Sequence, residues 1–342
     1  MLKEERQLLV GVSAGLNSMH TIIVREEADG RLRLMGEYRH RQVVQKPDET
    51  VLIHRVHESI EKAIEDAQVS PADILTIGVA SPGQIDINNG TVLFSPLFHV
   101  KEDPFPFVAR LHDYLDVHHI ALISNDDAQG IGEQRIGVGK GIKDIVYLRI
   151  GYNIGASIII DEKLYTGADN LAGMFGHMAV DLDGPECSCG NRGCLDAIVS
   201  RAAIGKNLLQ RYRDGQATSL ASQLNKEPFD INSAMIAEAI DQEDLLTSQV
   251  VEEAAEILGI GIANVINFLN PHRVILGGDV IDEIDLFFER AVASAREKTL
   301  HANMRNVSIV RGRLGTTAAA YGAAVFAKEH LLQKREQQSM EA

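Results

Sequence analysis

The three cysteines of this 342-residue chain all fall within eight residues of one another, in the segment GHMAVDLDGPECSCGNRGCLD. Together with His177, the residues Cys187, Cys189 and Cys194 offer one imidazole and three thiolates. Such a set completes a tetrahedral zinc shell and leaves no position for water. Three buried reduced thiols are the plainer alternative, but these cysteines stand among Gly, Asn and Asp rather than in an apolar run. The cluster therefore predicts a structural zinc loop over residues 177–194.

The composition of the chain argues against several classes of protein. It has 33 Lys+Arg against 48 Asp+Glu, a formal charge of −15, which argues against direct binding to nucleic acid. Its apolar runs are far shorter than the roughly 20 residues of a membrane span, and its first residues lack the apolar core of a signal peptide. A length of 342 residues exceeds what one hydrophobic core usually supports. We therefore expect a two-domain cytoplasmic protein with no membrane contact and no disulfide framework.

Short apolar runs alternate with amphipathic segments along the chain, which is typical of an α/β fold. Buried strands are expected at QLLVGVS, ILTIGVAS and HIALISN, and a helix capped by Asp48 is expected to run to about Gln68. The second half begins with strands DIVYLRIG and GASIIID, turns helical after the cysteines, and ends with the strand HRVILGGDV and the closing helix TAAAYGAAVFAKEHLLQK. This pattern predicts two α/β domains, residues 1–125 joined by the closing helix 316–342, and residues 126–315 with the zinc loop and a helical insertion.

The zinc loop and several glycine-containing segments resemble the ROK family, named for repressors, open reading frames and kinases. The spacing G-H-x9-C-x-C-G-x2-G-C-x-[ED] is similar to the family's zinc signature, and further resemblance lies in ASPGQID, SNDDAQGIGE, GYNIGASIIIDEKLYTG, VILGGDV and YGAA. The resemblance extends over nearly the whole chain. It implies a two-lobed, actin-like (ribonuclease H-like) ATPase fold in which a sugar and ATP meet in a cleft. It also implies a homodimer or a tetramer.

The resemblance assigns sugar-side roles to individual residues. In the family's kinases the Asp of an Asn-Asp pair takes the proton from the sugar hydroxyl, and Asn125-Asp126 is the match, with Asp127 as the base if the register is shifted. The same pair can equally well cap the helix that follows a strand. His177 lies close to the sugar as well as to the metal in the family, and Asp196 stands where a longer Glu is usual. The implied substrate-binding residues are Gly83, Asn125, Asp126, His177 and Asp196.

The nucleotide side departs from the kinase pattern. The resemblance implies nucleotide-binding residues at Gly15, Gly151, Gly155, Gly277 and Gly278. The first phosphate loop, D-x-G-G-T in kinases, is SAGLN over residues 13–17, and G-T-G-x-G is GYNIG over residues 151–155. Phosphoryl transfer depends on positioning and charge neutralisation, so these changes should lower its rate by orders of magnitude. On the sugar side, Met174 and Leu97 replace a Glu and an Asn, and each lost hydrogen bond costs ~1–3 kcal/mol.

These departures resemble the repressor branch of the family, whose ATP loops have decayed. Repressors carry a winged helix-turn-helix before the first strand, and here that strand is expected by about residue 7, so this module is not expected. We therefore predict a regulatory module that senses a small sugar or a protein partner, with lost or much reduced kinase activity. The alternative is an ATP-dependent hexose or N-acetylhexosamine kinase, and a third hypothesis is a scaffold in a larger regulatory complex. Structural Zn2+ is the expected cofactor, while ATP and Mg2+ belong to the kinase alternative alone.

Overall fold

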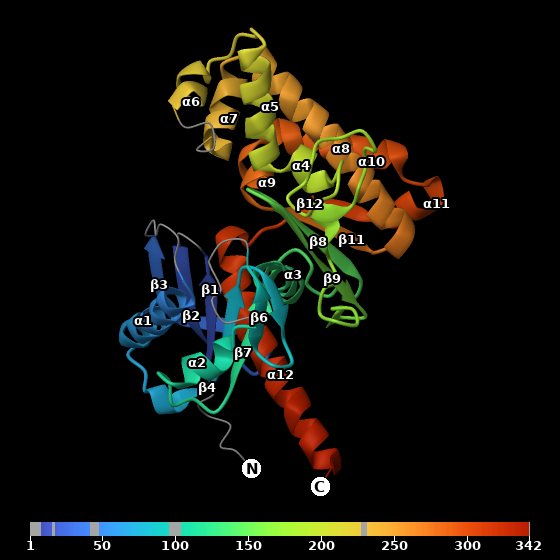
Figure 1. Ribbon diagram of the computed structural model, residues 1–342. Coiled ribbons are helices and arrows are strands. Elements are labelled where there is room, and N and C mark those ends of the chain that lie inside the picture. The colour runs from blue at the N-terminus through green and yellow to red at the C-terminus, as the bar shows by residue number, and fades with distance from the viewer. Residues whose placement is uncertain (1–7, 16–17, 42–47, 96–103, 227–230, 342) are drawn as a thin grey trace. The chain divides into compact units, whose positions relative to one another are not determined.

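The computed structural model describes residues 8–15, 18–41, 48–95, 104–226 and 231–341, and the chain forms two compact units (Figure 1). The first unit contains Met1–Gly141, Lys163–Ala172 and Thr316–Ala342, and the second contains Ile142–Glu162 and Gly173–Gly315. The chain first leaves the first unit after Gly141, whereas the sequence predicted a boundary after residue 125. The difference arises because helix α3 (Asn125–Arg135) packs against the closing helix α12 (Ala318–Glu341).

A five-stranded sheet with the order β3-β2-β1-β4-β7 forms the centre of the first unit. Strands β1, β4 and β7 run parallel, while β2 pairs antiparallel with both β1 and β3. The carboxyl ends of the three parallel strands therefore lie at one edge of the sheet. The strands are β1 (Leu8–Ala14), β2 (Ser18–Glu26), β3 (Leu32–Arg41), β4 (Ile74–Ser81) and β7 (Ile120–Ser124).

Successive residues of β1 point to opposite faces of this sheet, and a different helix covers each face. Leu8 and Val10 share a core with the apolar side of α1 (Glu49–Ala67), whereas Leu9 packs with Ala320 of α12. Gly11 lies on the α12 face, where a Cβ would stand 1.9 Å from the carbonyl oxygen of Ala320. The alanine-rich helix and the glycine together let the helix backbone approach the strand closely.

Helix α1 confirms the predicted element between Asp48 and Gln68. The Asp48 side chain accepts a hydrogen bond from the backbone N–H of Val51, as an N-cap does, and Gln68 ends the helix in the left-handed conformation. The smaller elements of this unit are η1 (Pro71–Asp73), the hairpin of β5 (Gln84–Asp86) and β6 (Thr91–Phe94), and α2 (Phe107–His112).

The second unit is built on a sheet in which β9, β8, β11 and β12 follow one another in this order. Strands β8, β11 and β12 run parallel and β9 is antiparallel to β8, so β8 and β11 also end at one edge. Val146 and Leu148 of β8 and Val274 and Leu276 of β11 share a core with helices α8 and α10. These strands are β8 (Ile145–Ile150), β9 (Ile154–Ile160), β11 (Arg273–Gly277) and β12 (Ser308–Arg311), whereas β10 (Lys163–Leu164) lies in the segment Lys163–Ala172.

Helices make up most of the second unit after the metal loop, as Figure 1 shows in yellow and orange. Helix α8 packs along α10, and α8 begins after Asp244, which accepts a hydrogen bond from the backbone N–H of Thr247. No described helix is long and apolar enough to cross a membrane. The helices are η2 (Phe175–His177), α4 (Leu195–Val199), α5 (Arg201–Arg213), α6 (Ala221–Lys226), α7 (Ser233–Asp241), α8 (Leu245–Leu269), α9 (Asp279–Glu283), α10 (Asp285–Lys298) and α11 (His301–Met304), with η4 (Gly315–Thr317) before α12.

Candidate functional site

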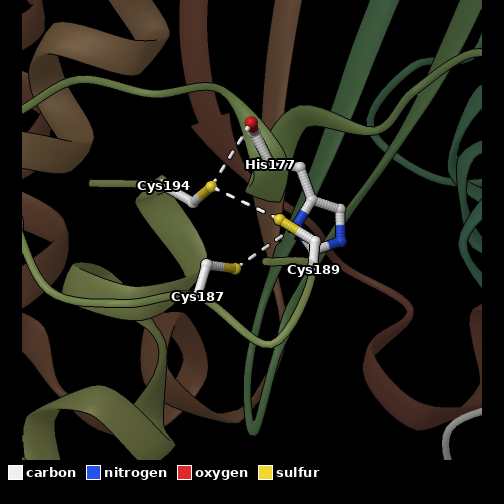
Figure 2. A group of neighbouring side chains, drawn as sticks. All are labelled: His177, Cys187, Cys189 and Cys194. Carbon is white, nitrogen blue, oxygen red and sulfur yellow. Dashed lines mark hydrogen bonds between the residues drawn. The ribbon is translucent and has the colours of Figure 1, made fainter. Parts of the chain in front are cut away.

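The four predicted metal ligands come together in the second unit (Figure 2). His177 ends η2, Cys194 immediately precedes α4, and Cys187 and Cys189 lie in the loop between these elements. One ligand atom from each residue lies within 4.8 Å of the others. Cys187 Sγ is 3.6 Å from His177 Nδ1, and Cys189 Sγ is 3.8 Å from Cys194 Sγ.

These separations suit a tetrahedral metal ion. With metal–sulfur bonds of about 2.3 Å and a metal–nitrogen bond of about 2.0 Å, two sulfurs lie about 3.8 Å apart, and a sulfur and a nitrogen about 3.5 Å apart. Cys194 is fully buried, and this burial together with the neighbouring thiols raises its pKa to about 12. Ionising all three thiols at these distances is strongly unfavourable unless a cation lies between them. The chemistry and spacing of the cluster therefore fit a bound metal ion.

The backbone of the metal loop is fixed by its own hydrogen bonds. The N–H of Cys187 donates to the carbonyl of Asn191 at 2.8 Å, and the N–H of Gly190 donates to the carbonyl of Cys187 at 3.0 Å. Gly193 has a positive φ of 67°, and a Cβ there would stand 1.6 Å from the carbonyl oxygen of Asp181. Glycine at this position is what lets Cys194 follow the loop so tightly.

Asp196 connects the metal loop to the turn between β8 and β9. It lies in the first turn of α4, two residues after Cys194, and its Oδ1 accepts a hydrogen bond from the backbone N–H of Ile154 at 2.7 Å. Burial raises the pKa of Asp196, while the Ile154 N–H and the nearby His177 oppose that rise. The residue predicted to contact a sugar hydroxyl therefore also holds the start of β9.

In the first unit, the predicted residues gather at the carboxyl edge of the sheet. Gly15 follows β1, Gly83 lies two residues after β4, and Asn125 and Asp126 follow β7 directly. Asn125 Nδ2 donates a hydrogen bond to the carbonyl oxygen of Ala14 at 3.2 Å, which ties α3 to the end of β1. Ligands of open α/β sheets bind outside the carboxyl ends of parallel strands. Three residues used in the comparison with kinases lie outside the described residues: Leu16, Asn17 and Leu97.

Ser124, rather than the Asn-Asp pair, caps helix α3. Its Oγ accepts a hydrogen bond from the backbone N–H of Asp127 at 3.1 Å and donates to Asp127 Oδ2 at 2.7 Å. The Ser124 side chain thus caps the helix, and the Asp127 carboxylate in turn accepts a hydrogen bond from the Ser124 hydroxyl. The Asp127 carboxylate is therefore committed to the helix start, and Asp126 lies one residue before it in the same first turn.

The predicted nucleotide-side glycines of the second unit do not all lie together. Gly151 follows β8, Gly277 ends β11, and Gly278 comes next with a positive φ of 97°. A Cβ at Gly278 would stand 2.3 Å from the carbonyl oxygen of Ile150, so the glycine pair lies against the end of β8. Gly155, in contrast, lies within β9 in the ladder with β8.

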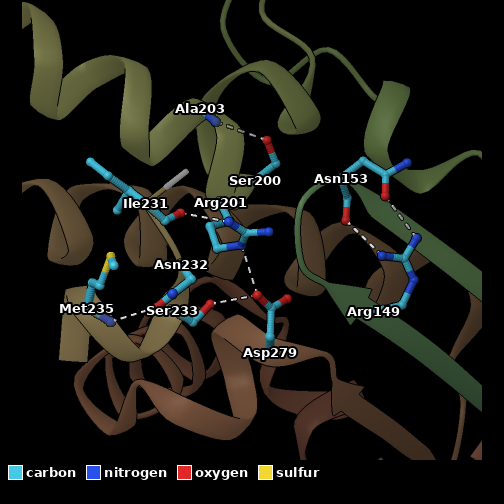
Figure 3. A network of polar contacts seen from close by, with 10 residues as sticks. All are labelled: Arg149, Asn153, Ser200, Arg201, Ala203, Ile231, Asn232, Ser233, Met235 and Asp279. Carbon is cyan, nitrogen blue, oxygen red and sulfur yellow. Dashed lines mark hydrogen bonds and ion pairs between the residues drawn. The ribbon is translucent and has the colours of Figure 1, made fainter. Parts of the chain in front are cut away.

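The sequence interpretation missed a polar network around this turn (Figure 3). Arg149 donates from Nη1 to the carbonyl oxygen of Asn153 at 3.1 Å and from Nη2 to Asn153 Oδ1, also at 3.1 Å. Asp279 follows the glycine pair and forms an ion pair with Arg201, the first residue of α5. Arg149 within a buried run and Asp279 after two glycines were visible signals, but nothing in the sequence joined Asp279 to a residue 78 positions earlier.

The fold and these sites define the class of protein. A ROK family glucokinase from Streptomyces griseus, crystallised with glucose and AMPPNP, matches the structure with a TM-score of 0.78 and 26% identity, covering 94% of this chain and 99% of that one. The actin-like ATPase fold predicted from the sequence is thus confirmed.

The ROK family model matches residues 10–330, and the chain belongs to the ROK family. It is 29% identical to a xylose repressor of Caldicellulosiruptor bescii over 315 residues, which are 92% of this chain and 76% of the repressor. It is 28% identical to a glucokinase of Thermotoga maritima over 326 residues, which are 94% of this chain and 98% of the glucokinase. The chain is therefore similar to both repressors and kinases.

Proposed function

We propose that this protein is a regulatory member of its family that binds a small sugar and has lost, or largely lost, phosphoryl transfer. One relative is a xylose repressor and another is a glucokinase, so a sugar is named on both branches that the chain resembles. The ligand we expect is accordingly a pentose or a hexose. The metal cluster serves as a structural zinc site that holds one wall of the sugar pocket through His177.

Asp126 is the residue we propose to accept a hydrogen bond from the sugar hydroxyl. Asp127 is the less suitable of the two carboxylates, because its Oδ2 already accepts a hydrogen bond from the Ser124 hydroxyl. In the second unit we propose His177 and Asp196 as sugar contacts. Asp196 is shorter than the glutamate usual in the family, and Met174 supplies no polar group, so we expect weaker or less hydroxyl-rich recognition.

We base the proposed loss of phosphoryl transfer on the backbone N–H groups of Gly151 and Gly15, which donate hydrogen bonds to carbonyl groups of the protein itself. The N–H of Gly151 donates to the carbonyl of Asn153 at 3.2 Å, and the N–H of Gly15 donates to the carbonyl of Ser18 at 2.8 Å. Phosphate-binding turns instead present such N–H groups to the ligand. In addition, the Tyr152 side chain stands half-exposed on the Gly151 turn, where kinases carry a small residue.

A working sugar kinase is the second candidate, favoured by Asp126 in the first turn of α3 and by the retained pair Gly277-Gly278. One experiment separates the two. Purified protein is incubated with Mg-ATP and a panel of pentoses, hexoses and N-acetylhexosamines, while ADP release and the melting temperature are followed. We expect a sugar-dependent rise in melting temperature and no ADP release.

Turnover above about 1 per second with any sugar would establish the kinase instead. Absence of both ADP release and a sugar-dependent change in melting temperature would support the scaffold hypothesis. Asp126→Asn is the matched variant, because it keeps the size of the side chain and removes the charge. We expect it to weaken the sugar-dependent shift while leaving the melting temperature of the sugar-free protein close to that of the wild type.

A further inference from the structure

Arg201 is held at the centre of a network that joins four segments of the second unit (Figure 3). Its Nη1 donates to the carbonyl oxygen of Ile231 at 2.6 Å, and its backbone N–H donates to the carbonyl of Gly151 at 2.8 Å. Its Nε lies 2.8 Å from Asp279 Oδ2 without hydrogen-bond alignment, so this contact is an ion pair. The Arg201 side chain is only 17% exposed, so its charge depends on a neighbouring anion.

The counter-ion of Arg201 is the carboxylate of Asp279, which lies against the turn at Gly151. A Cβ added to Gly151 would stand 2.7 Å from Asp279 Oδ1, which shows how closely the carboxylate lies against the turn. Ser233 Oγ donates to Asp279 Oδ2 at 2.8 Å and fixes the orientation of the group. Asp279 therefore has one oxygen toward Arg201 and Ser233 (Figure 3). Its other oxygen lies toward Gly151.

Two aspects of this arrangement are those of an anion site. A guanidinium and a serine hydroxyl converge on Asp279 Oδ2, and groups of both kinds bind phosphate as readily as carboxylate. The Tyr152 ring lies over the Arg201 guanidinium, 5.5 Å from the ring centre, and shields the pair on one side. A phosphate brought to this turn would meet a fixed negative charge where it needs donors, and like charges at contact distance repel strongly in a partly buried site.

We propose that Asp279 is a built-in anion that occupies the place of a phosphate at the Gly151 turn and closes this turn to phosphate-containing ligands. This inference rests on the proposed function, since it supplies a physical reason why the second unit does without a nucleotide. ATP therefore does not fit this turn as the chain stands. The same ion pair joins α5 to α9 without any ligand, and the hydrogen bond from Arg201 to Ile231 adds a third segment.

Inorganic phosphate is the probe that tests the proposal, with melting temperature as the readout and sodium chloride holding the ionic strength constant. The wild type should show only the small general stabilisation that phosphate gives to folded proteins. Asp279→Ala removes the internal anion and leaves Arg201 without its counter-ion, so its melting temperature should rise by about 3 °C between zero and roughly 100 mM phosphate. The double variant Asp279→Ala/Arg201→Ala, which lacks the cation as well, should again show only the small shift of the wild type.

A wild type that shifts as much as Asp279→Ala would overturn the proposal, and so would a folded Asp279→Ala that ignores phosphate. A response kept in the double variant would also overturn it, because the anion would then be held elsewhere. If the alanine variant fails to fold, Asp279→Asn replaces it, because asparagine keeps the size of the side chain. We expect a smaller phosphate response from Asp279→Asn than from Asp279→Ala, and the absence of any response would count against the proposal. The sugar-dependent shift of the wild type, measured alongside without phosphate, reports on the proposed function separately.

Discussion

Two histidines at the junction of α12 with the first sheet should make this unit sensitive to acid. His119 lies immediately before β7, and its Nε2 is hydrogen-bonded to Nδ1 of His330 on α12 at 3.1 Å. The other ring nitrogen of His119, Nδ1, lies 2.7 Å from Thr76 Oγ1. Phe326 stacks on the His330 ring at 5.6 Å. Burial, together with the positive charge of Lys334, lowers the pKa of both histidines to about 4.

The direction of the pH effect follows from these pKa values. In the unfolded chain each histidine binds a proton near pH 6.5, but in the folded protein neither does so until about pH 4. The contribution of the two histidines to the free energy of unfolding is therefore fully present above about pH 6.5 and is lost as the pH falls toward 4. A shift of this size corresponds to about 3 kcal/mol per histidine at full protonation, and to about 2 kcal/mol at pH 5.

The matched comparison is wild type against His330→Gln. The glutamine amide can still donate to His119 Nε2 but does not titrate, so the difference reports the titration of His330 together with its effect on the pKa of His119. Urea unfolding followed by circular dichroism at pH 7.5, 6 and 5, with equal zinc in every sample, measures the free energy of unfolding. We expect the wild type to lose about 2 kcal/mol more than the variant between pH 7.5 and pH 5. Parallel losses in the two proteins would refute the reasoning.

Three further predictions concern the metal loop, the helix packing and the sugar. Cys189→Ala should lose its bound zinc by elemental analysis and melt at a lower temperature, and an unchanged metal content would contradict the assignment. Gly322→Ala should lower the free energy of unfolding, measured by urea denaturation, by about 2 kcal/mol or more, because the added Cβ would stand 1.7 Å from the carbonyl oxygen of Ala128. An unchanged free energy of unfolding would mean that α12 and α3 separate easily. Asp196→Asn keeps an acceptor for the N–H of Ile154, so it should retain its melting temperature but show a reduced sugar-dependent shift; an unaltered shift would remove Asp196 from the sugar contacts.

The features predicted well from the sequence are those whose partners lie close along the chain. The metal cluster is contained in residues 177–194, so the spacing alone brings its donors together. The cap at Asp48 involves a backbone N–H three residues ahead, and the helix forms where the pattern placed it. At α3, however, serine, asparagine and aspartate are all good caps, so the choice of Ser124 depended on where β7 ends.

The features that the sequence could not supply depend on packing between distant segments. Arg201 and Asp279 are 78 positions apart, and each alone reads as an ordinary charged residue near a helix start. Their pairing depends on how α5 and α9 are placed by the sheet of the second unit. Likewise, helix α3 joined the first unit because Ala128 and Gly322 allow a close approach to α12, a complementarity of small residues that no single segment displays.

The return of α12 to the first unit sets an order on how this protein can be made. A ribosome synthesises β1, β2 and β4 first and α12 last, with nearly the whole second unit emerging in between. Until then, the sheet face that carries Leu9, Ile22 and Val24 has no helix to cover it. The first unit to begin synthesis is thus the last to complete its core, and during translation its uncovered face is the surface that chaperones would need to protect.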